Sequence, residues 1–197
     1  MIPAILGAYL IGAVPIGWLV ARAFGVSDIR RHGSGNIGAT NVLRTLGRLP
    51  AIVTLLGDVA KGYAAVALAA YLVWPDPRPI AAATVAAVVG NCWSVFLGFR
   101  GGKGGATGLG ALLRLVPWAT LAALPVFVAI VATTRYVSLG TLLGALCVPL
   151  GAALLGYPIA YVLAALAAAL IVVGRHHANI GRLWAGTESR LGQKSTA

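Results

Sequence analysis

Long apolar stretches, separated by short polar ones, make up most of this chain of 197 residues. Because a helix needs about 20 apolar residues to cross a bilayer, each long stretch predicts a membrane-spanning helix. These stretches lie at about 2–24, 50–74, 79–99, 116–133, 137–156 and 158–174. Another segment, at about 105–116, is apolar over a much shorter length. Whether this short segment crosses the membrane decides the topology.

The composition agrees with the pattern. The chain is 59% hydrophobic and only 10% charged, whereas a soluble domain carries about 25% charged residues. We therefore expect an all-α integral membrane protein, built as one polytopic domain over residues 1–197 and packed as a compact, monomeric bundle. The first apolar run lacks the basic start of a cleaved signal peptide, so it should be a retained helix. Cys92 and Cys147 show no metal-ligand spacing, and we expect no metal site.

The basic residues predict how the helices are oriented. The segments 25–49 and 174–197 both belong inside the cell by the positive-inside rule, because they carry Arg30, Arg31, Arg44, Arg48, Arg175, Arg182, Arg190 and Lys194. An even number of crossings must then follow the third long run, which requires the 105–116 segment to cross. The prediction is a bundle of seven transmembrane helices with the N-terminus outside and the C-terminus in the cytoplasm. If 105–116 is only half inserted, or 116–156 crosses once fewer, five helices remain.

The net charge of +11 would suggest nucleic acid as a partner in a soluble chain. Here the cations lie between apolar segments with few aromatic residues beside them, so we expect no nucleic-acid binding. Their concentration in three glycine-containing windows, at 33–48, 98–107 and 174–188, needs another explanation. All three windows face the same compartment in the predicted topology, so they can converge on one site.

The first window, "GSGNIGATNVLRTLG", matches a dinucleotide fingerprint at Gly33, Gly35 and Gly38. No strand precedes it, so that interpretation fails. The glycines nevertheless leave backbone N–H groups free to face an anion, and the helix that follows adds its positive end. On that helix, the spacing of Asn41, Arg44 and Arg48 predicts one shared face.

The second window, "GFRGGKGGAT", places Lys103 between two glycine pairs but lacks the Walker pattern. Its N–H groups and ammonium suit a phosphate or a developing oxyanion. In the third window, "GRHHANIGRLWAGTE", Arg175, Asn179 and Arg182 recur at helical spacing. His176 lies beside them and could act as a general base or a donor. We expect His177 at the rim.

Asp58 and Lys61 lie three positions apart within a predicted membrane helix. A charge in that environment requires a partner. An ion pair that orients the helix beneath the site is the preferred interpretation, and direct participation in chemistry is the alternative.

Taken together, "GSGNIGATNVLRTLG", "DVAKG", "FRGGKGGAT" and "RHHANIGRLWAGTE" resemble the acyl-phosphate-dependent glycerol-3-phosphate acyltransferases of bacterial membranes, the PlsY family. The resemblance covers nearly the whole chain. It implies transfer of an acyl group from a long-chain acyl phosphate to the sn-1 hydroxyl of glycerol 3-phosphate, giving lysophosphatidic acid and phosphate, the first step of phospholipid synthesis. It also implies a seven-helix fold in the bacterial plasma (inner) membrane with a cytoplasmic active site, no cofactor, and contact with membrane lipids.

The resemblance assigns roles to individual residues. The expected catalytic residues are Ser34, Lys103, His176 and Asn179. Those expected to bind substrate are Gly35, Asn36, Asn41, Arg44, Gly101, Gly102, Gly104 and Arg175. The sequence departs from the family pattern at Asn91, where a histidine is usual, at Ser94, where proline is common, and at Gly105, where valine is usual. An indispensable proton-transfer role at position 91 is therefore not expected.

Two chemical routes remain open at this stage. In the preferred route the glycerol hydroxyl attacks the acyl carbon directly, and His176 or the donor's own phosphate takes the proton. In the other, Ser34 is a nucleophile activated by His176, for which only the distant Glu188 offers an orienting carboxylate. The competing function is a membrane transporter for phosphorylated metabolites, since broken, glycine-rich helices also mark transport sites.

Overall fold

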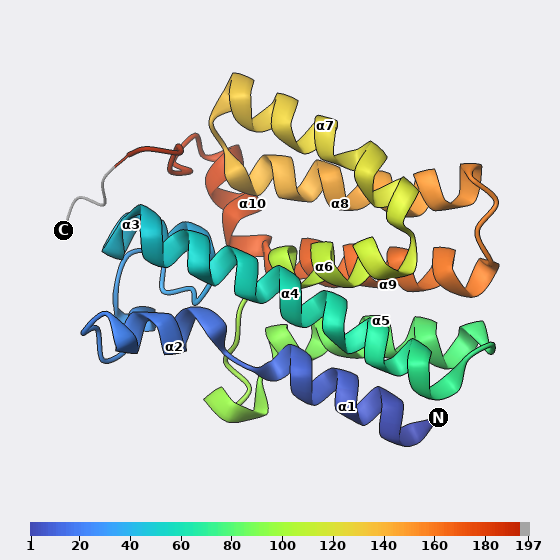
Figure 1. The fold of residues 1–197 in the computed structure, drawn as a ribbon. Helices are drawn as coiled ribbons and strands as arrows, with labels where there is room; N and C mark the ends of the chain where they lie inside the picture. Colours follow the sequence, from blue (N-terminus) through green and yellow to red (C-terminus); the bar gives the residue numbers. More distant parts are fainter. Residues whose placement is uncertain (194–197) are drawn as a thin grey trace.

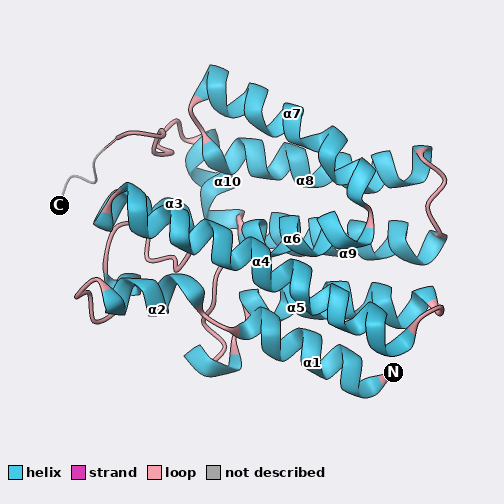
Figure 2. Ribbon diagram, viewed as in Figure 1, coloured by secondary structure: helices cyan, strands magenta, loops and turns pink. Residues whose placement is uncertain are grey.

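The computed structural model describes residues 1–193, and its regular elements are all helices (Figure 2). Lys194, one of the predicted cytoplasmic cations, lies outside the described residues. In chain order the helices are α1 (Ile2–Ala13), α2 (Ile16–Ala23), α3 (Ala39–Leu46), α4 (Arg48–Val73), α5 (Pro77–Cys92), α6 (Gly105–Leu115), α7 (Pro117–Thr134), α8 (Val137–Leu154), α9 (Ile159–Arg175) and α10 (His177–Trp184). Two short 3₁₀ turns, η1 (Ile29–Arg31) and η2 (Val95–Leu97), lie in the connections. The predicted all-α class is confirmed.

The long helices run side by side between two ends of the bundle (Figure 1). The most extensive contacts pair α1 with α5, α4 with α6, and α7 with α8, while α9 packs on both α8 and α5. One end holds α2, α3, α10 and the C-terminal segment; the other holds the N-terminus and the turns after α4 and α8. The three polar windows therefore lie at the same end of the molecule.

Small residues allow the helices to approach closely. A Cβ added to Gly62 of α4 would collide with the carbonyl oxygen of Thr107 on α6, and one added to Gly110 of α6 would collide with that of Val59 on α4. Apolar attraction between helices is weak in lipid, so close backbone packing supplies much of the association energy. The Ala- and Gly-rich runs of the sequence thus fix the position of α6 against α4.

Among residues 1–193, five segments are long and apolar enough to cross a membrane, and a sixth is formed if the bent pair of α9 and α10 counts as one span. The first predicted run forms one such segment, Ile2–Ala23, but it is interrupted at Val14 and Pro15. Proline lacks the N–H that a helix needs and disfavours helical geometry in the residue before it. The third predicted run corresponds to the segment Pro77–Leu97, in which α5 ends at Cys92 and the 3₁₀ turn η2 follows.

The short segment forms α6, which has 11 residues. At 1.5 Å per residue it is about 16 Å long, roughly half of a 30 Å hydrocarbon core. By its length alone α6 does not count as a span, and the predicted total of seven is not established by the helix lengths.

Lys61 joins the break in the first span to two other helices. Its Nζ donates to the carbonyl oxygen of Val14 (2.6 Å) and to Oδ1 of Asn91 on α5 (2.9 Å), and lies 2.8 Å from Oδ1 of Asp58. Asp58 and Lys61 are 5% and 7% exposed. The predicted ion pair is confirmed, and its lysine provides the carbonyl oxygen of Val14, at the helix break, with a second donor besides the N–H of Ile16.

Candidate functional site

The first window is folded around the side chain of Asn41. Its Oδ1 accepts a hydrogen bond from the backbone N–H of Ser34 (2.8 Å), and its Nδ2 donates to the carbonyl oxygens of Asn36 (2.8 Å) and His32 (3.0 Å). The helix begins after Gly38 and ends at Leu46, where Gly47 has a φ of 90°. Arg48 therefore begins α4. The prediction that Arg48 shares a helix face with Asn41 and Arg44 is wrong, because the helix that carries those two residues ends before it.

The second window passes close beside the end of α5. The N–H of Gly101 donates to the carbonyl oxygen of Cys92 (3.2 Å), and that of Gly102 donates to Asn91 (2.8 Å). A Cβ on Gly101 would collide with the oxygen of Asn91, so only glycine fits there. Arg175, at the end of α9, donates through Nε and Nη2 to the carbonyl oxygen of Gly102 (3.2 and 3.1 Å). The loop before Lys103 is thus held from two sides.

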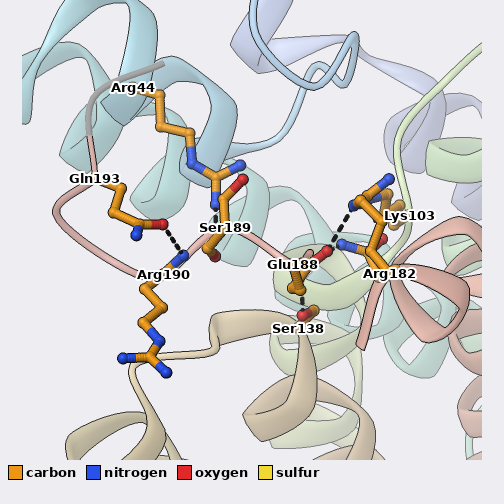
Figure 3. Close-up of polar contacts among 9 residues, drawn as sticks. Arg44, Lys103, Ser138, Arg182, Glu188, Ser189, Arg190 and Gln193 are labelled. Atoms are coloured by element: carbon orange, nitrogen blue, oxygen red, sulfur yellow. Dashed lines mark hydrogen bonds and ion pairs between the residues drawn. The ribbon is translucent and has the colours of Figure 1, made fainter. Parts of the chain in front are cut away.

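The third window meets Lys103 through a chain of hydrogen bonds. Nζ of Lys103 donates to Oδ1 of Asn179, and Nδ2 of Asn179 donates to Oε1 of Glu188 (2.7 Å). Ser138, at the start of α8, donates to the same oxygen (2.8 Å), while Nε of Arg182 pairs with Oε2 (2.7 Å) (Figure 3). Glu188 thereby orients the amide that accepts from Lys103.

His176 is buried at the junction of α9 and α10, with Nδ1 2.7 Å from the carbonyl oxygen of Val172. A carbonyl oxygen accepts only, so Nδ1 carries the proton in this contact and Nε2 of the neutral ring is left as an acceptor. Glu188 binds Asn179, Ser138 and Arg182, not this ring. The role of orienting carboxylate considered for Glu188 therefore has no support in the geometry. His177 is exposed, as expected.

One cavity of about 340 Å³ collects most of the predicted site residues. Its polar part is lined by residues from all three windows, namely Ser34, Asn36, Asn41, Arg44, Gly102, Lys103, Gly104, His176 and Asn179. The cavity continues between α6, α7, α8 and α9, where it is lined chiefly by apolar residues, among them Leu109, Leu112, Ala123, Leu124, Phe127, Ala145, Val148, Ala168, Ala169 and Val172. A polar mouth and an apolar interior are joined in one space.

Three predicted substrate-binding residues lie elsewhere. Gly35, Gly101 and Arg175 line a separate hollow on the other side of the two glycine loops, not the cavity. Ser138 was not predicted as a site residue, because it lies in an apolar run and gives no local signal. Asn91 was noted only as a departure from the family pattern. Asn91 and Asp58 also line the cavity.

The charges at the mouth are tuned by burial and by each other. Burial, together with nearby Arg182 and Arg44, lowers the pKa of Lys103 to about 8. Burial would raise the pKa of Glu188, but hydrogen bonds from Asn179, Ser138 and Arg182 outweigh it and the pKa falls below its usual value. Glu188 is therefore an anion at neutral pH, and Lys103 is a cation that loses its proton unusually easily.

Two helix N-termini also face the mouth. Gly38, Ala39 and Thr40 at the start of α3, and Gly104, Gly105 and Ala106 at the start of α6, all line the cavity. The first N–H groups of a helix have no partner within the helix and attract anions. With Arg44 and Lys103 between them, they form a place where two phosphate groups can be held together.

Comparison with known proteins agrees with this geometry. The family model described as glycerol-3-phosphate acyltransferase matches residues 2–186. The glycerol-3-phosphate acyltransferase of Geobacter sulfurreducens is 51% identical over 184 residues, covering 93% of this chain and 94% of the relative. That of Desulforamulus reducens is 46% identical over 192 residues, covering 98% and 96%.

Two solved structures have the same fold. Both are crystal structures of PlsY, an integral membrane glycerol 3-phosphate acyltransferase, one in its glycerol 3-phosphate form (TM-score 0.92) and one in its lysophosphatidic acid form (TM-score 0.90). Each is 34% identical in sequence, and each comparison covers 97% of this chain and 95% of that one. This multi-pass bacterial membrane protein belongs to the glycerol-3-phosphate acyltransferase family and is an enzyme that transfers an acyl group to glycerol 3-phosphate.

Proposed function

We propose that the acyl donor is a long-chain acyl phosphate and that both substrates react in the cavity described above, without a cofactor. The observation that carries this proposal is the continuity of a cationic mouth with an apolar interior. An acyl phosphate likewise has a charged phosphate group at one end and a hydrocarbon chain at the other. Its chain would lie between α6, α7, α8 and α9, and its phosphate would meet Lys103 and the N-terminus of α6.

Glycerol 3-phosphate would bind toward α3, with its phosphate at Arg44 and the N-terminus of that helix. Nη2 of Arg44 donates to the carbonyl oxygen of Ser189 (3.2 Å), which fixes the guanidinium at the cavity wall. This arrangement brings the sn-1 hydroxyl to the acyl carbon and makes the reaction effectively intramolecular. The products would be lysophosphatidic acid and inorganic phosphate.

We infer direct attack by the glycerol hydroxyl on the acyl carbon. The C–O bond to the donor phosphate breaks, and phosphate leaves with the bonding electrons. Lys103 would neutralise the charge that develops on the leaving group or on the carbonyl oxygen. The hydroxyl proton would pass to Nε2 of His176 or to the donor phosphate.

A covalent route through Ser34 has less support. Within residues 1–193 the Ser34 hydroxyl has no hydrogen bond to His176 or to another side chain, as an activated serine nucleophile requires. Mass spectrometry of enzyme quenched during turnover distinguishes the routes. Direct attack leaves Ser34 unmodified, whereas an acyl-serine adduct formed at the rate of turnover would require the covalent route.

For the membrane topology we propose seven crossings in the bacterial inner membrane, with the N-terminus outside and the cavity mouth in the cytoplasm. The alternation of α1–α2, α4, α5, α6, α7, α8 and α9 between the two ends of the bundle supports this count (Figure 1). The short α6 would cross by packing against α4 and α9 instead of facing lipid along its whole length. The protein would act as a monomer and one polytopic domain, since its cavity is complete within one chain.

The activity is tested with purified protein, palmitoyl phosphate and labelled glycerol 3-phosphate, scored for lysophosphatidic acid. We expect rapid product with acyl phosphate and little when acyl-CoA is the only donor. Equal or faster turnover with acyl-CoA would reject the proposed donor. The transporter alternative has no support, because the family matched over residues 2–186 is one of acyltransferases.

A further inference from the structure

A second hollow, of about 520 Å³, lies beside the catalytic cavity and has no role in the reaction proposed above. Its lining comes from the loop before α3, the loop before α6 and the end of α9. The residues are Asp28, Arg30, Arg31, Gly35, Phe99, Arg100, Gly101 and Arg175. We define this set as the arginine hollow.

Only a thin wall of backbone separates the arginine hollow from the catalytic cavity. Ser34 and Asn36 line the cavity, whereas Gly35 between them lines the hollow. In the second loop, Gly102 lines the cavity and Gly101 lines the hollow. A group bound in the hollow would therefore contact the same two loops as the substrates, from the opposite side.

The charge of the hollow is strongly positive. It contains four arginines and one aspartate, so three positive charges are left after Asp28 is counted. Asp28 forms an ion pair with Arg30, in which Nη2 of the arginine lies 2.8 Å from Oδ2 of the aspartate. Within residues 1–193, the side chains of Arg31 and Arg100 have neither a hydrogen bond nor an ion pair. These two guanidinium groups are available to bind an anion.

The backbone beside Arg100 adopts a conformation that costs energy. Phe99 has a φ of 63° although it is not glycine. Its N–H donates to the carbonyl oxygen of Ser94 (2.8 Å), and the Ser94 hydroxyl donates to the carbonyl oxygen of Ala13 (2.6 Å). Left-handed geometry in a bulky residue is maintained only where its surroundings enforce it, and such residues cluster at ligand sites.

Arg175 connects the hollow to the catalytic loop. It lines the hollow, its guanidinium lies 5.2 Å from the ring centre of Trp93, and it donates both hydrogen bonds to the carbonyl oxygen of Gly102. Gly102 directly precedes Lys103. An anion in the hollow that draws Arg175 away from this carbonyl would loosen the loop that holds the catalytic ammonium group.

We propose that the arginine hollow is a second, non-catalytic anion site that binds a phosphate group and adjusts the affinity of the cavity for glycerol 3-phosphate. The planar guanidinium fork matches phosphate oxygens in pairs, and Arg31 and Arg100 are the primary ligands. Both an anionic lipid headgroup at the membrane surface and free inorganic phosphate carry this chemistry. Either would act on bound glycerol 3-phosphate through Gly35, whose neighbours Ser34 and Asn36 line the cavity just before α3, and on the loop that carries Lys103 through Arg175 and Gly102.

The test compares R31Q/R100Q with R22Q/R48Q, in purified protein reconstituted in neutral phosphatidylcholine nanodiscs. Arg22 on α2 and Arg48 at the start of α4 are exposed and line neither cavity nor hollow, and α2 lies at the same end of the bundle as α3 (Figure 1). The control therefore removes the same charge. Two probes are used separately, phosphatidylglycerol added to the nanodisc and inorganic phosphate added to the buffer. Saturating glycerol 3-phosphate occupies the catalytic cavity while binding of each probe is measured by native mass spectrometry and thermal unfolding.

We expect R31Q/R100Q to bind one of the two probes at least about tenfold more weakly than the control does, because two charge-assisted contacts are lost. Weaker binding of phosphatidylglycerol alone identifies a lipid headgroup as the ligand, and weaker binding of inorganic phosphate alone identifies the free ion. The same probe should shift the KM for glycerol 3-phosphate in the control but not in R31Q/R100Q. If both probes bind both proteins equally, the site does not exist. Because binding is measured directly, that result is distinguishable from a failure of the proposed acyl donor.

Discussion

Lys103 and Asn179, which are 76 positions apart in the chain, are joined by a hydrogen bond from the lysine Nζ to the amide Oδ1. The contact links the loop before α6 to α10 across the mouth of the cavity. Because Glu188 receives the other end of the same amide, the ammonium group is positioned by a residue that it does not touch. The chemistry of Lys103 therefore depends on the C-terminal segment.

The pH dependence of catalysis should report the titration of Lys103. Its pKa is lowered to about 8, so the cation is present below that pH and is lost as the pH rises through it. The value of kcat/KM should fall on the alkaline side near pH 8, well below the pKa of about 10.4 of a free lysine. In K103R, residual activity should lack this decline, because arginine stays charged. Wild-type activity that stays constant up to the free-lysine pKa would contradict the assignment.

Substitution E188Q should lower both stability and turnover. A glutamine can still accept from Asn179 and Ser138 through its oxygen, but its NH₂ group then faces Nε of Arg182, another donor. We expect a loss of about 1–3 kcal/mol in the free energy of unfolding and a clear fall in kcat. S138A is the matched control, since Asn179 still donates to Oε1 and the pair with Arg182 is retained. Thermal unfolding and steady-state kinetics measure the two effects, and E188Q kinetics equal to those of S138A would disprove the positioning role.

Removal of one partner of the buried ion pair between Asp58 and Lys61 should destabilise the protein more than removal of both. K61M leaves Asp58 buried without its cation, and we expect a cost of about 3–5 kcal/mol. D58N/K61M removes both charges and should recover part of that loss. Thermal unfolding of the single and double variants in the same detergent provides the comparison. A double variant less stable than K61M would show that the pair itself contributes the net stabilisation.

Close packing of α4 on α6 should make Gly62 and Gly110 intolerant of a methyl group. G62A and G110A would each force the two backbones apart, moving the N-terminus of α6 that faces the cavity. We expect lower thermal stability and a higher KM. G7A is the control, because a Cβ at Gly7 meets nothing within 4 Å, and alanine in a helix is favoured over glycine by up to about 1 kcal/mol. Unfolding temperatures of G62A and G7A that coincide would contradict the packing argument.

The apolar part of the cavity should limit the length of the acyl chain. Val148 lines it eleven positions along α8 from Val137, which is about 16 Å into the bundle. V148F should fill the deep end and raise the KM for long-chain acyl phosphates more than for short-chain ones. L146F, at a residue 44% exposed on the same helix, should leave the preference unchanged. Equal effects of V148F on short and long donors would place the chain elsewhere.

The sequence alone determined the helical membrane class, the approximate limits of the long helices and the chemistry of the three polar windows. Hydropathy and residue type are properties of contiguous residues, so they can be evaluated along the chain before any folding is known. The pairing of Asp58 with Lys61 was also predictable, because a spacing of three on a helix fixes their proximity.

Only the tertiary structure decided which side of each loop a residue faces. Gly35, Gly101 and Arg175 were expected to bind substrate with their neighbours, yet they line the arginine hollow. Gly35 and Gly101 lie in loops whose adjacent residues face the cavity, and Arg175 reaches the carbonyl oxygen of Gly102 from the end of α9. Two further contacts join residues dozens of positions apart. Lys103 meets Asn179, which Glu188 orients, and Lys61 meets Val14 at the break in the first span. Such contacts are set by the close packing of small-residue helices and by the path of the loops between them, which no local pattern encodes.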